Sequence, residues 1–286
     1  MKYGFLGAGN LSSAIIMGLL KAGFRSEDIF VSSPHSAALL SKRLAINNVD
    51  EDRLLADCDL IVLAFLPEQL DSIVQQVGSE KFANKLIVSV LGSTSLKELT
   101  EFLPTAKIVR VLPNVNAEFN NSLTSVAFGQ NLSNEDLKLT KNFLQAFGTI
   151  IELAERDFPA FSAIAGSGPA FVALFIKALQ EAGIKQGIDS KESLQIALHT
   201  IKGSTENILQ SGKTADQLVK KVASPGGSTA DGVESLEENH FIETVNNAIL
   251  ATINHGRKKV SIIGKKSLLK LVLQRLFKKM ARLIYR

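Results

Sequence analysis

Short apolar runs alternate with amphipathic segments over the first half of the chain. The run at 59–65 is continuously apolar after one acid, which is typical of a strand buried on both faces of a parallel sheet. Similar runs predict strands at 3–6, 28–31, 86–90 and 107–111, helices at 14–22, 36–44, 67–77, 94–102 and 133–147, and edge strands at 124–128 and 149–153. This alternation predicts an α/β fold with a Rossmann-type, doubly wound parallel sheet.

The pattern changes near Glu155, after which only long helical periodicities occur. Glycines separate the candidate helices, which are 159–183, 190–211, 214–222, 229–237 and 240–256. We therefore expect three parts in the chain. They are a Rossmann-like α/β domain at 1–154, an all-α domain at 155–256, and a basic amphipathic extension at 257–286.

Composition and charge narrow the class of protein. With 286 residues, 45% hydrophobic and 21% charged, the chain fits about two globular domains. Cys58 is the single cysteine, which excludes an intrachain disulfide framework and a thiolate zinc cluster. The net charge of +4 comes from the tail. Residues 257–286 carry 11 Lys/Arg and no acid, so the rest has 21 basic against 28 acidic residues, a net −7. A basic nucleic-acid groove is not expected.

Targeting signals are not expected either. The chain runs from Met1 straight into a Gly-rich turn, with no room for the apolar region of a signal peptide. The uncharged stretch at 159–176 has the length of a short membrane span, but Gly166 to Pro169 interrupts it. We interpret this stretch as a buried helix of a cytoplasmic protein.

The strongest chemical signal is the glycine-rich turn from Gly7 to Ser12, which links the first strand to the first helix. The first glycine permits a tight turn, and Gly9 lets the backbone approach a pyrophosphate at the helix N-terminus. Ser12 stands where Gly or Ala is usual. The same pattern also fits a plain turn, but its place at the first strand–helix junction favours dinucleotide binding.

The end of the second strand bears on which dinucleotide is bound. NAD-preferring sites usually place Asp or Glu there, whereas this chain has Ser32-Ser33-Pro34-His35. These hydroxyls, with Lys42 or Arg43, are candidates to receive a 2′-phosphate, although Ser33-Pro34 also fits a helix start. The pattern favours NADPH and leaves NADH possible.

Two further clusters lie in the helical half. Gly166-Ser167-Gly168-Pro169-Ala170 breaks an apolar segment, and Ser224-Pro225-Gly226-Gly227-Ser228-Thr229 precedes a helix. Consecutive glycines before a helix can present several N–H groups to a carboxylate, and Thr229 adds a hydroxyl. Composition alone equally allows tight turns between helices.

Together with Arg110 and Pro113-Asn114, these motifs resemble pyrroline-5-carboxylate reductase, in order and spacing over about 1–256. The resemblance implies reduction of the C=N bond of 1-pyrroline-5-carboxylate by NAD(P)H to give L-proline, without a metal. It also implies that the domain at 1–154 binds NAD(P), and that the all-α domain at 155–256 is a dimerisation and substrate domain, which forms a homodimer that often assembles further. The implied cofactor residues are Leu6, Gly7, Ala8, Gly9, Asn10, Leu11, Ser32, Ser33, Ala64, Pro67 and Asn114. The implied substrate residues are Glu155, Ser224, Gly226, Gly227, Ser228 and Thr229, with Thr229 catalytic through the ring nitrogen.

Departures from the family pattern fall on the cofactor side. Leu66-Pro67 replaces Lys-Pro, Val115-Asn116 replaces Thr-Pro, and Val90-Leu91-Gly92 replaces two alanines and a glycine. They leave two alternatives open: a divergent paralogue that reduces another small cyclic imine, or a non-catalytic nucleotide-binding regulatory protein.

The tail at 257–286 and a few reactive side chains have simple structural interpretations. Apolar residues at helical spacing from Leu269 to Ile284, with basic residues between them, fit a helix on an acidic membrane or partner. A simple extension, packed on the dimer or poorly ordered, is the interpretation that we favour.

Cys58 is expected to be a packed thiol, the histidines lack metal-ligand spacing, and Asp50-Glu51-Asp52 is interpreted as a solvated helix start.

Overall fold

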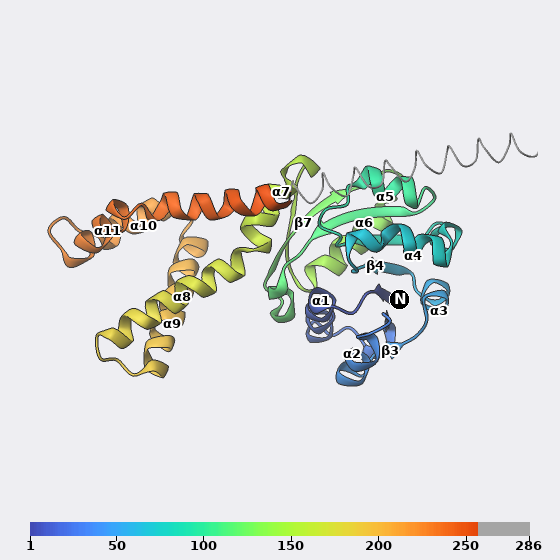
Figure 1. Cartoon of the computed structure of the whole chain (residues 1–286), viewed down its shortest axis with the longest axis horizontal. Helices are drawn as coiled ribbons and strands as arrows, with labels where there is room; N and C mark the ends of the chain where they lie inside the picture. Colours follow the sequence, from blue (N-terminus) through green and yellow to red (C-terminus); the bar gives the residue numbers. More distant parts are fainter. Residues whose placement is uncertain (257–286) are drawn as a thin grey trace, which may run out of the picture. The chain divides into compact units, whose positions relative to one another are not determined.

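The computed structural model describes residues 1–256, so the predicted amphipathic tail at 257–286 lies outside the described residues. The chain divides into two compact units, a sheet unit and a helical unit, coloured along the sequence in Figure 1. The sheet unit comprises Met1–Gly166 together with residues 252–256. The helical unit is Ser167–Ala251.

The sheet unit is built on one eight-stranded sheet with the order β3-β2-β1-β4-β5-β6-β7-β8. The strands are β1 (Tyr3–Leu6), β2 (Ile29–Ser32), β3 (Asn47–Asn48), β4 (Leu60–Leu63), β5 (Leu86–Ser89), β6 (Lys107–Leu112), β7 (Ser122–Phe128) and β8 (Gly148–Glu152). The order reverses between β1 and β4, which makes their carboxyl ends the topological switch point of the fold. The predicted Rossmann-type α/β fold is confirmed, and β3 is a strand that the apolar pattern does not reveal.

Helices connect these strands. They are α1 (Asn10–Lys21), α2 (Ala37–Leu44), α3 (Glu51–Asp57), α4 (Leu70–Val77), α5 (Leu96–Phe102) and α6 (Asn134–Gln145), with short 3-10 turns at Ser26–Asp28, Pro67–Gln69, Ser79–Phe82, Val115–Phe119 and Glu155–Asp157. Helix α1 begins four residues before the predicted start at 14, because the Gly7–Gly9 turn leads directly into it. The Asp50-Glu51-Asp52 segment opens α3, as the sequence indicates.

One strand pair departs from the predicted parallel sheet. Strand β7 runs antiparallel to β6, while β8 is parallel to β7. A parallel pair needs a crossover of a dozen or more residues. Only the short segment with the turn Val115–Phe119 separates β6 from β7, so the chain can only double back.

The core explains why the strands lack polar alternation. Leu60 and Val62 of β4 pack in one apolar cluster with residues of α1 and α6, such as Ile16 and Phe143. Ile61 and Leu63 point to the opposite face and pack with residues of α3, α4 and α5, including Leu99. Both faces of the sheet are therefore covered, as the continuous apolar runs predict.

The helical unit contains α8 (Gly168–Lys185), α9 (Ser190–Ser211), α10 (Ala215–Val222) and α11 (Ser228–Glu238), and residues 241–256 are also helical. Helices α8 and α9 form an antiparallel pair around Gly183, where an added Cβ would lie 2.2 Å from Ser193 Oγ. The Ser193 hydroxyl donates to the Gln180 carbonyl at 2.7 Å and locks the pair.

The predicted single helix at 159–183 is wrong in its first part. The chain forms α7 (Phe158–Phe161), a π-helical turn at Ser162–Gly166, and then a new start at Gly168. Pro169 lacks a backbone donor and therefore fits only the first turn of α8.

One helical stretch of the chain is apolar enough to resemble a membrane span. The helical stretch Glu155–Lys185 contains an 18-residue segment with a mean hydropathy of 1.6. It is long and apolar enough to cross a membrane, a property that core helices of soluble proteins share. Within the described residues 1–256, no residue of helix α8 is buried. Apolar side chains of α8 such as Leu174 are exposed there.

Candidate active site

The predicted dinucleotide turn closes tightly between two strands. Gly7 has a φ of +109°, and an added Cβ would lie 2.2 Å from the Ala64 carbonyl oxygen, just beyond β4. Only glycine tolerates both the backbone conformation and this approach. By contrast, an added Cβ on Gly9 meets no atom within 4 Å and faces open space. Gly7 thus serves the fold, and Gly9 leaves room for a ligand.

Helix α1 begins at this turn with the features of an anion site. Gly9 is the N-cap, so no side chain caps the first N–H groups, and the first turn contains no acidic residue. The free N–H groups and the positive end of the helix dipole both favour a negatively charged group. A pyrophosphate has the charge and shape for this position.

A cavity of about 430 Å³ opens beside this helix end, at the switch point of the sheet. Its lining comes from the carboxyl ends of β1, β2 and β4 with the segments that follow them, the residue after β5, the start of α1, and one residue each of α3 and α4. The lining residues are Leu6, Gly7, Ala8, Gly9, Asn10, Leu11, Ser12, Ser32, Ser33, Pro34, His35, Ser36, Glu51, Ala64, Phe65, Leu66, Gln69, Ile73 and Val90.

The structure brings most of the predicted cofactor residues together at this cavity. All of them line it except Pro67 and Asn114. Asn114 is buried, and its side chain hydrogen-bonds two backbone groups. Its amide donates to the Ala165 carbonyl at 2.8 Å, and its Oδ1 accepts from the N–H of Asn116 at 3.0 Å. Asn114 therefore fixes the segment after β6.

Sequence reasoning missed Glu51 as a cavity residue. A search for an acid at the end of β2 finds only Ser32 and Ser33, whereas Glu51 reaches the cavity from the start of α3. Strand β3 pairs with β2 in parallel, with Asn48 opposite Val31, and this pairing carries the following residues to the same sheet edge. Two residues are too short for the apolar pattern to mark β3, so no signal pointed there.

A second cavity, of about 770 Å³, lies in the sheet unit near the predicted substrate residue Glu155. Its lining comes from the loop after β5, from α5, from α7 with the following turn, and from residues 252–256. The charged residues that line it are Lys97, Glu98, Glu101, Arg110 and Glu155, and Phe158 also lines it.

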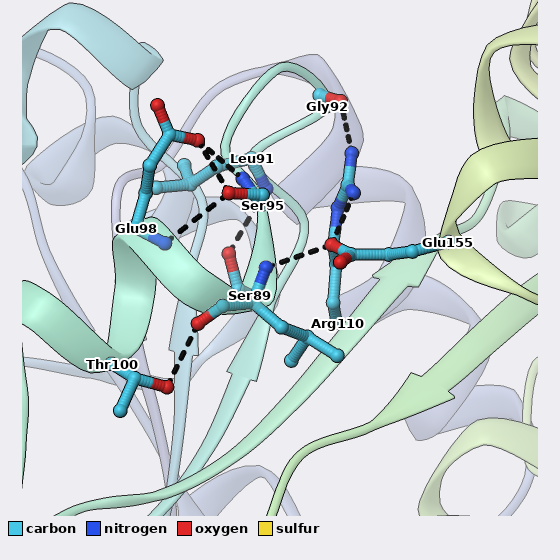
Figure 2. A network of polar contacts seen from close by, with 9 residues as sticks. Ser89, Leu91, Gly92, Ser95, Glu98, Thr100, Arg110 and Glu155 are labelled. Atoms are coloured by element: carbon cyan, nitrogen blue, oxygen red, sulfur yellow. Dashed lines mark hydrogen bonds and ion pairs between the residues drawn. The ribbon is translucent and has the colours of Figure 1, made fainter.

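Arg110 and Glu155 belong to one polar network, drawn in Figure 2. Glu155 Oε1 accepts from Arg110 Nη1 at 2.5 Å and from the N–H of Leu96 at 2.7 Å. Arg110 Nη2 donates to the Gly92 carbonyl at 2.7 Å, and its guanidinium lies 4.7 Å from the centre of the Phe158 ring. Arg110 is 7% exposed. The pair thus ties β6, the loop after β5 and the start of α5 to the turn at Glu155–Asp157.

The Ser224–Thr229 segment has the geometry of a turn that opens a helix. The N–H of Gly227 donates to the Ser224 carbonyl at 3.0 Å, and Gly226 has a φ of +75°. Proline followed by such a glycine is typical of a type II turn. Gly227 caps α11 without a side chain, and Thr229 lies exposed in the first turn. This segment belongs to the helical unit, whereas Glu155 belongs to the sheet unit.

Cys58 does not have the properties of a nucleophile. It is fully buried, and burial raises the pKa of its thiol to about 12, with a further contribution from Asp57. In residues 1–256, no three or more His, Cys, Asp or Glu side chains are grouped so that they could hold a metal ion.

Comparison with known proteins agrees with this geometry. Residues 155–259 match the family model described as pyrroline-5-carboxylate reductase dimerisation, and residues 2–93 match one described as NADP oxidoreductase, coenzyme F420-dependent. The pyrroline-5-carboxylate reductase of Aquifex aeolicus is 33% identical over 260 residues, which cover 90% of this chain and 97% of that protein. The enzyme of Methanosarcina acetivorans is 31% identical over 270 residues, 93% of this chain and 98% of that protein.

Solved structures show the same likeness. The Plasmodium falciparum pyrroline carboxylate reductase with NADP bound has a TM-score of 0.83 and 32% identity, over 90% of this chain and 97% of that chain. The Streptococcus pyogenes 1-pyrroline-5-carboxylate reductase has a TM-score of 0.81 and 30% identity, over 90% and 98%. The resemblance inferred from the motifs is confirmed, and this chain belongs to the pyrroline-5-carboxylate reductase family.

Proposed function

We propose that this protein reduces 1-pyrroline-5-carboxylate to L-proline by hydride transfer from NAD(P)H. The observation that carries the proposal is the cavity at the Gly7–Gly9 turn, in a chain whose relatives over most of its length are pyrroline-5-carboxylate reductases. We assign cofactor binding to 1–154 and substrate binding with assembly to 155–256.

The cofactor side fits a nicotinamide dinucleotide. The open space at Gly9 and the uncapped start of α1 would hold the pyrophosphate, and Ser32 with Ser33 would face the adenosine ribose. Leu6, Ala8, Leu11 and Ala64 give that cavity its apolar wall. When bound, NAD(P)H supplies the hydride that reduces the imine.

The substrate side follows from the turn before α11. The N–H groups of Ser228 and Thr229, in the first turn of α11, would hold the substrate carboxylate, because Gly227 caps this helix without a side chain. The N–H of Gly227 itself is held by the Ser224 carbonyl and fixes the turn. The exposed Thr229 hydroxyl would hydrogen-bond the ring nitrogen, the atom that gains a proton as the adjacent carbon gains the hydride. The chain therefore acts mainly by holding the imine in position.

In our proposal Glu155 takes part in substrate binding, and through Arg110 it also holds neighbouring residues of the sheet unit in position. Its Oε1 is occupied by Arg110 and the N–H of Leu96, while the carboxylate still lines the second cavity. The pair keeps the loop at Gly92, at the carboxyl end of β5, in a fixed place.

The protein works as a homo-oligomer, and we propose that the basic unit is a dimer formed through the helical unit, with room for higher assembly. Large apolar side chains there are exposed within one chain, among them Leu174 at 66%, Leu209 at 72% and Ile242 at 68%. Such a surface is typical of a protein interface. A second copy can cover these residues without lipid, so the apolar surface does not require a membrane. We propose a cytoplasmic location.

Oxidation of NADPH and of NADH by 1-pyrroline-5-carboxylate, with detection of L-proline, tests the proposal. Thr229→Ala should lower kcat about 100-fold with little change in cofactor affinity, and Thr229→Ser should recover most of the loss. Equal losses of turnover and cofactor affinity would contradict the role of Thr229. Turnover of another cyclic imine but not of this substrate would support a divergent paralogue, and binding of nucleotide without any turnover would support a regulatory protein.

A further inference from the structure

Three consecutive acidic residues at the start of α3 make different contacts. Asp50 Oδ1 accepts from the N–H of Arg53 at 2.7 Å and caps the helix. Asp52 pairs with Lys81 at 2.7 Å. The side chain of Glu51 has no hydrogen bond or ion pair among the described residues, and Glu51 lines the cavity beside the Gly7–Gly9 turn. The sequence treats the three as one solvated helix start, but only Glu51 faces a ligand cavity.

The fold explains why Glu51 reaches this position. Asn48, the last residue of β3, pairs with Val31 of β2, so both strands end at the same edge of the sheet. Ser32 and Ser33 follow there from β2, and Glu51 follows from β3. In dinucleotide-binding folds this edge contacts the adenosine ribose.

The charge of the cavity wall is unusual for a site that must hold a 2′-phosphate. Within the described part of the chain, the lining contains one carboxylate, Glu51, one histidine, His35, and no lysine or arginine. Lys42 and Arg43, the expected phosphate partners, do not line it, and Arg43 donates to the Ser13 hydroxyl instead.

A carboxylate at this edge discriminates between the two cofactors by simple chemistry. It accepts hydrogen bonds from ribose hydroxyls, whereas it repels a 2′-phosphate, which carries about −1.5 to −2 charges near pH 7. The hydroxyls of Ser33 and Ser36 lie 3.2 Å apart and add no positive charge.

We propose that Glu51 is a cofactor-specificity residue, which accepts the 2′-hydroxyl of NADH and disfavours the 2′-phosphate of NADPH. This role rests on one part of the proposed function, namely that the cavity binds a nicotinamide dinucleotide. This proposal favours NADH, whereas the absence of an acid at Ser32-Ser33 favours NADPH. The two expectations differ because the acid comes from the end of β3.

Binding of nucleotide fragments tests this role without any turnover. Titration calorimetry on the full chain compares ADP-ribose with 2′-phospho-ADP-ribose for the unmodified protein, for Glu51→Gln and Glu51→Asn, and for Asp52→Asn as the matched control. Asp52 carries the same charge next to Glu51 but is held by Lys81 and does not line the cavity.

The unmodified protein should bind ADP-ribose at least about tenfold more tightly than the 2′-phosphorylated form. Each Glu51 variant should reduce this ratio of affinities about tenfold, because it loses one hydrogen bond to a charged group. Asp52→Asn should leave the ratio unchanged. A preference for the phosphorylated fragment, an unchanged ratio in both Glu51 variants, or no binding of either fragment would overturn the role of Glu51. The predicted ratios together with no imine reduction would contradict the proposed function alone.

Discussion

Arg110 and Glu155 form an ion pair in which the arginine is buried and the glutamate is partly open to the second cavity. The side chains are 9% and 30% exposed, and the same carboxylate oxygen also accepts the N–H of Leu96. Removing one partner of such a pair leaves the other charge buried without compensation.

Glu155→Ala should therefore lower the free energy of unfolding by about 2 kcal/mol, less than for a fully buried pair because Glu155 retains some solvent. Urea unfolding measures this loss. Arg156→Ala is the control, since Arg156 is 86% exposed and pairs with Asp157 only at 3.7 Å. It should change stability by less than about 0.5 kcal/mol. Equal effects of the two substitutions would remove the positioning role of Glu155.

The two glycines of the cofactor turn should respond differently to a methyl group. Gly9→Ala adds a Cβ in open space at a φ of −79°, so the protein should fold with normal stability and lose most of its cofactor affinity. Gly7→Ala drives a Cβ into the Ala64 carbonyl and should lower the thermal midpoint or prevent folding. Thermal unfolding combined with NADH titration separates the two. Normal cofactor binding by Gly9→Ala would place the pyrophosphate elsewhere.

A charge on the exposed apolar surface of the helical unit should break the assembly. Leu174→Glu on α8 replaces a side chain that is 66% exposed in one chain, and sedimentation velocity should show the oligomer dissociating at micromolar concentration. Leu39→Glu in the sheet unit is the control, because Leu39 is 75% exposed but lies on α2. If both variants keep the oligomer, α8 is not part of the interface.

The raised pKa of Cys58 has a measurable consequence for stability. The unfolded thiol releases its proton near pH 9, whereas the folded thiol holds it to about pH 12. The folded state therefore loses stability as pH rises through this window, by up to about 1.4 kcal/mol per pH unit.

Urea unfolding across that window detects the loss, and Cys58→Ala should remove this pH-dependent part while losing some packing at every pH. A folded thiol that reacts with iodoacetamide at pH 9 as fast as the unfolded chain would contradict the burial of Cys58.

Much of the sheet unit is readable from the sequence because both faces of its strands are apolar. Successive residues of β4 pack alternately into the apolar clusters on the two faces of the sheet, so the whole run is apolar. The turn from Gly7 to Ser12 is recognised from its position between β1 and α1. Strand β3 could not be predicted from the sequence, because it consists of only two asparagines, Asn47 and Asn48, which show no apolar pattern. Glu51 is missed for that same reason.

The helical half is less readable in its details. The turn at Ser162–Gly166 has a helix-like pattern, so its π-helical geometry depends on packing and on the Pro169 restart. The apolar pattern of α8 is typical of a buried helix, yet among the described residues α8 has only partly buried and exposed side chains. We expect that a second copy covers them.

Transfer of deuterium tests the reductase function most directly. NADH or NADPH deuterated at the transferred position of the nicotinamide is incubated with the oligomeric protein and 1-pyrroline-5-carboxylate, and the product is analysed by mass spectrometry and NMR. We expect L-proline with one deuterium on the former imine carbon, and Thr229→Ala should slow its formation. Absence of proline, or proline without the label, from folded and oligomeric protein would contradict the proposed function.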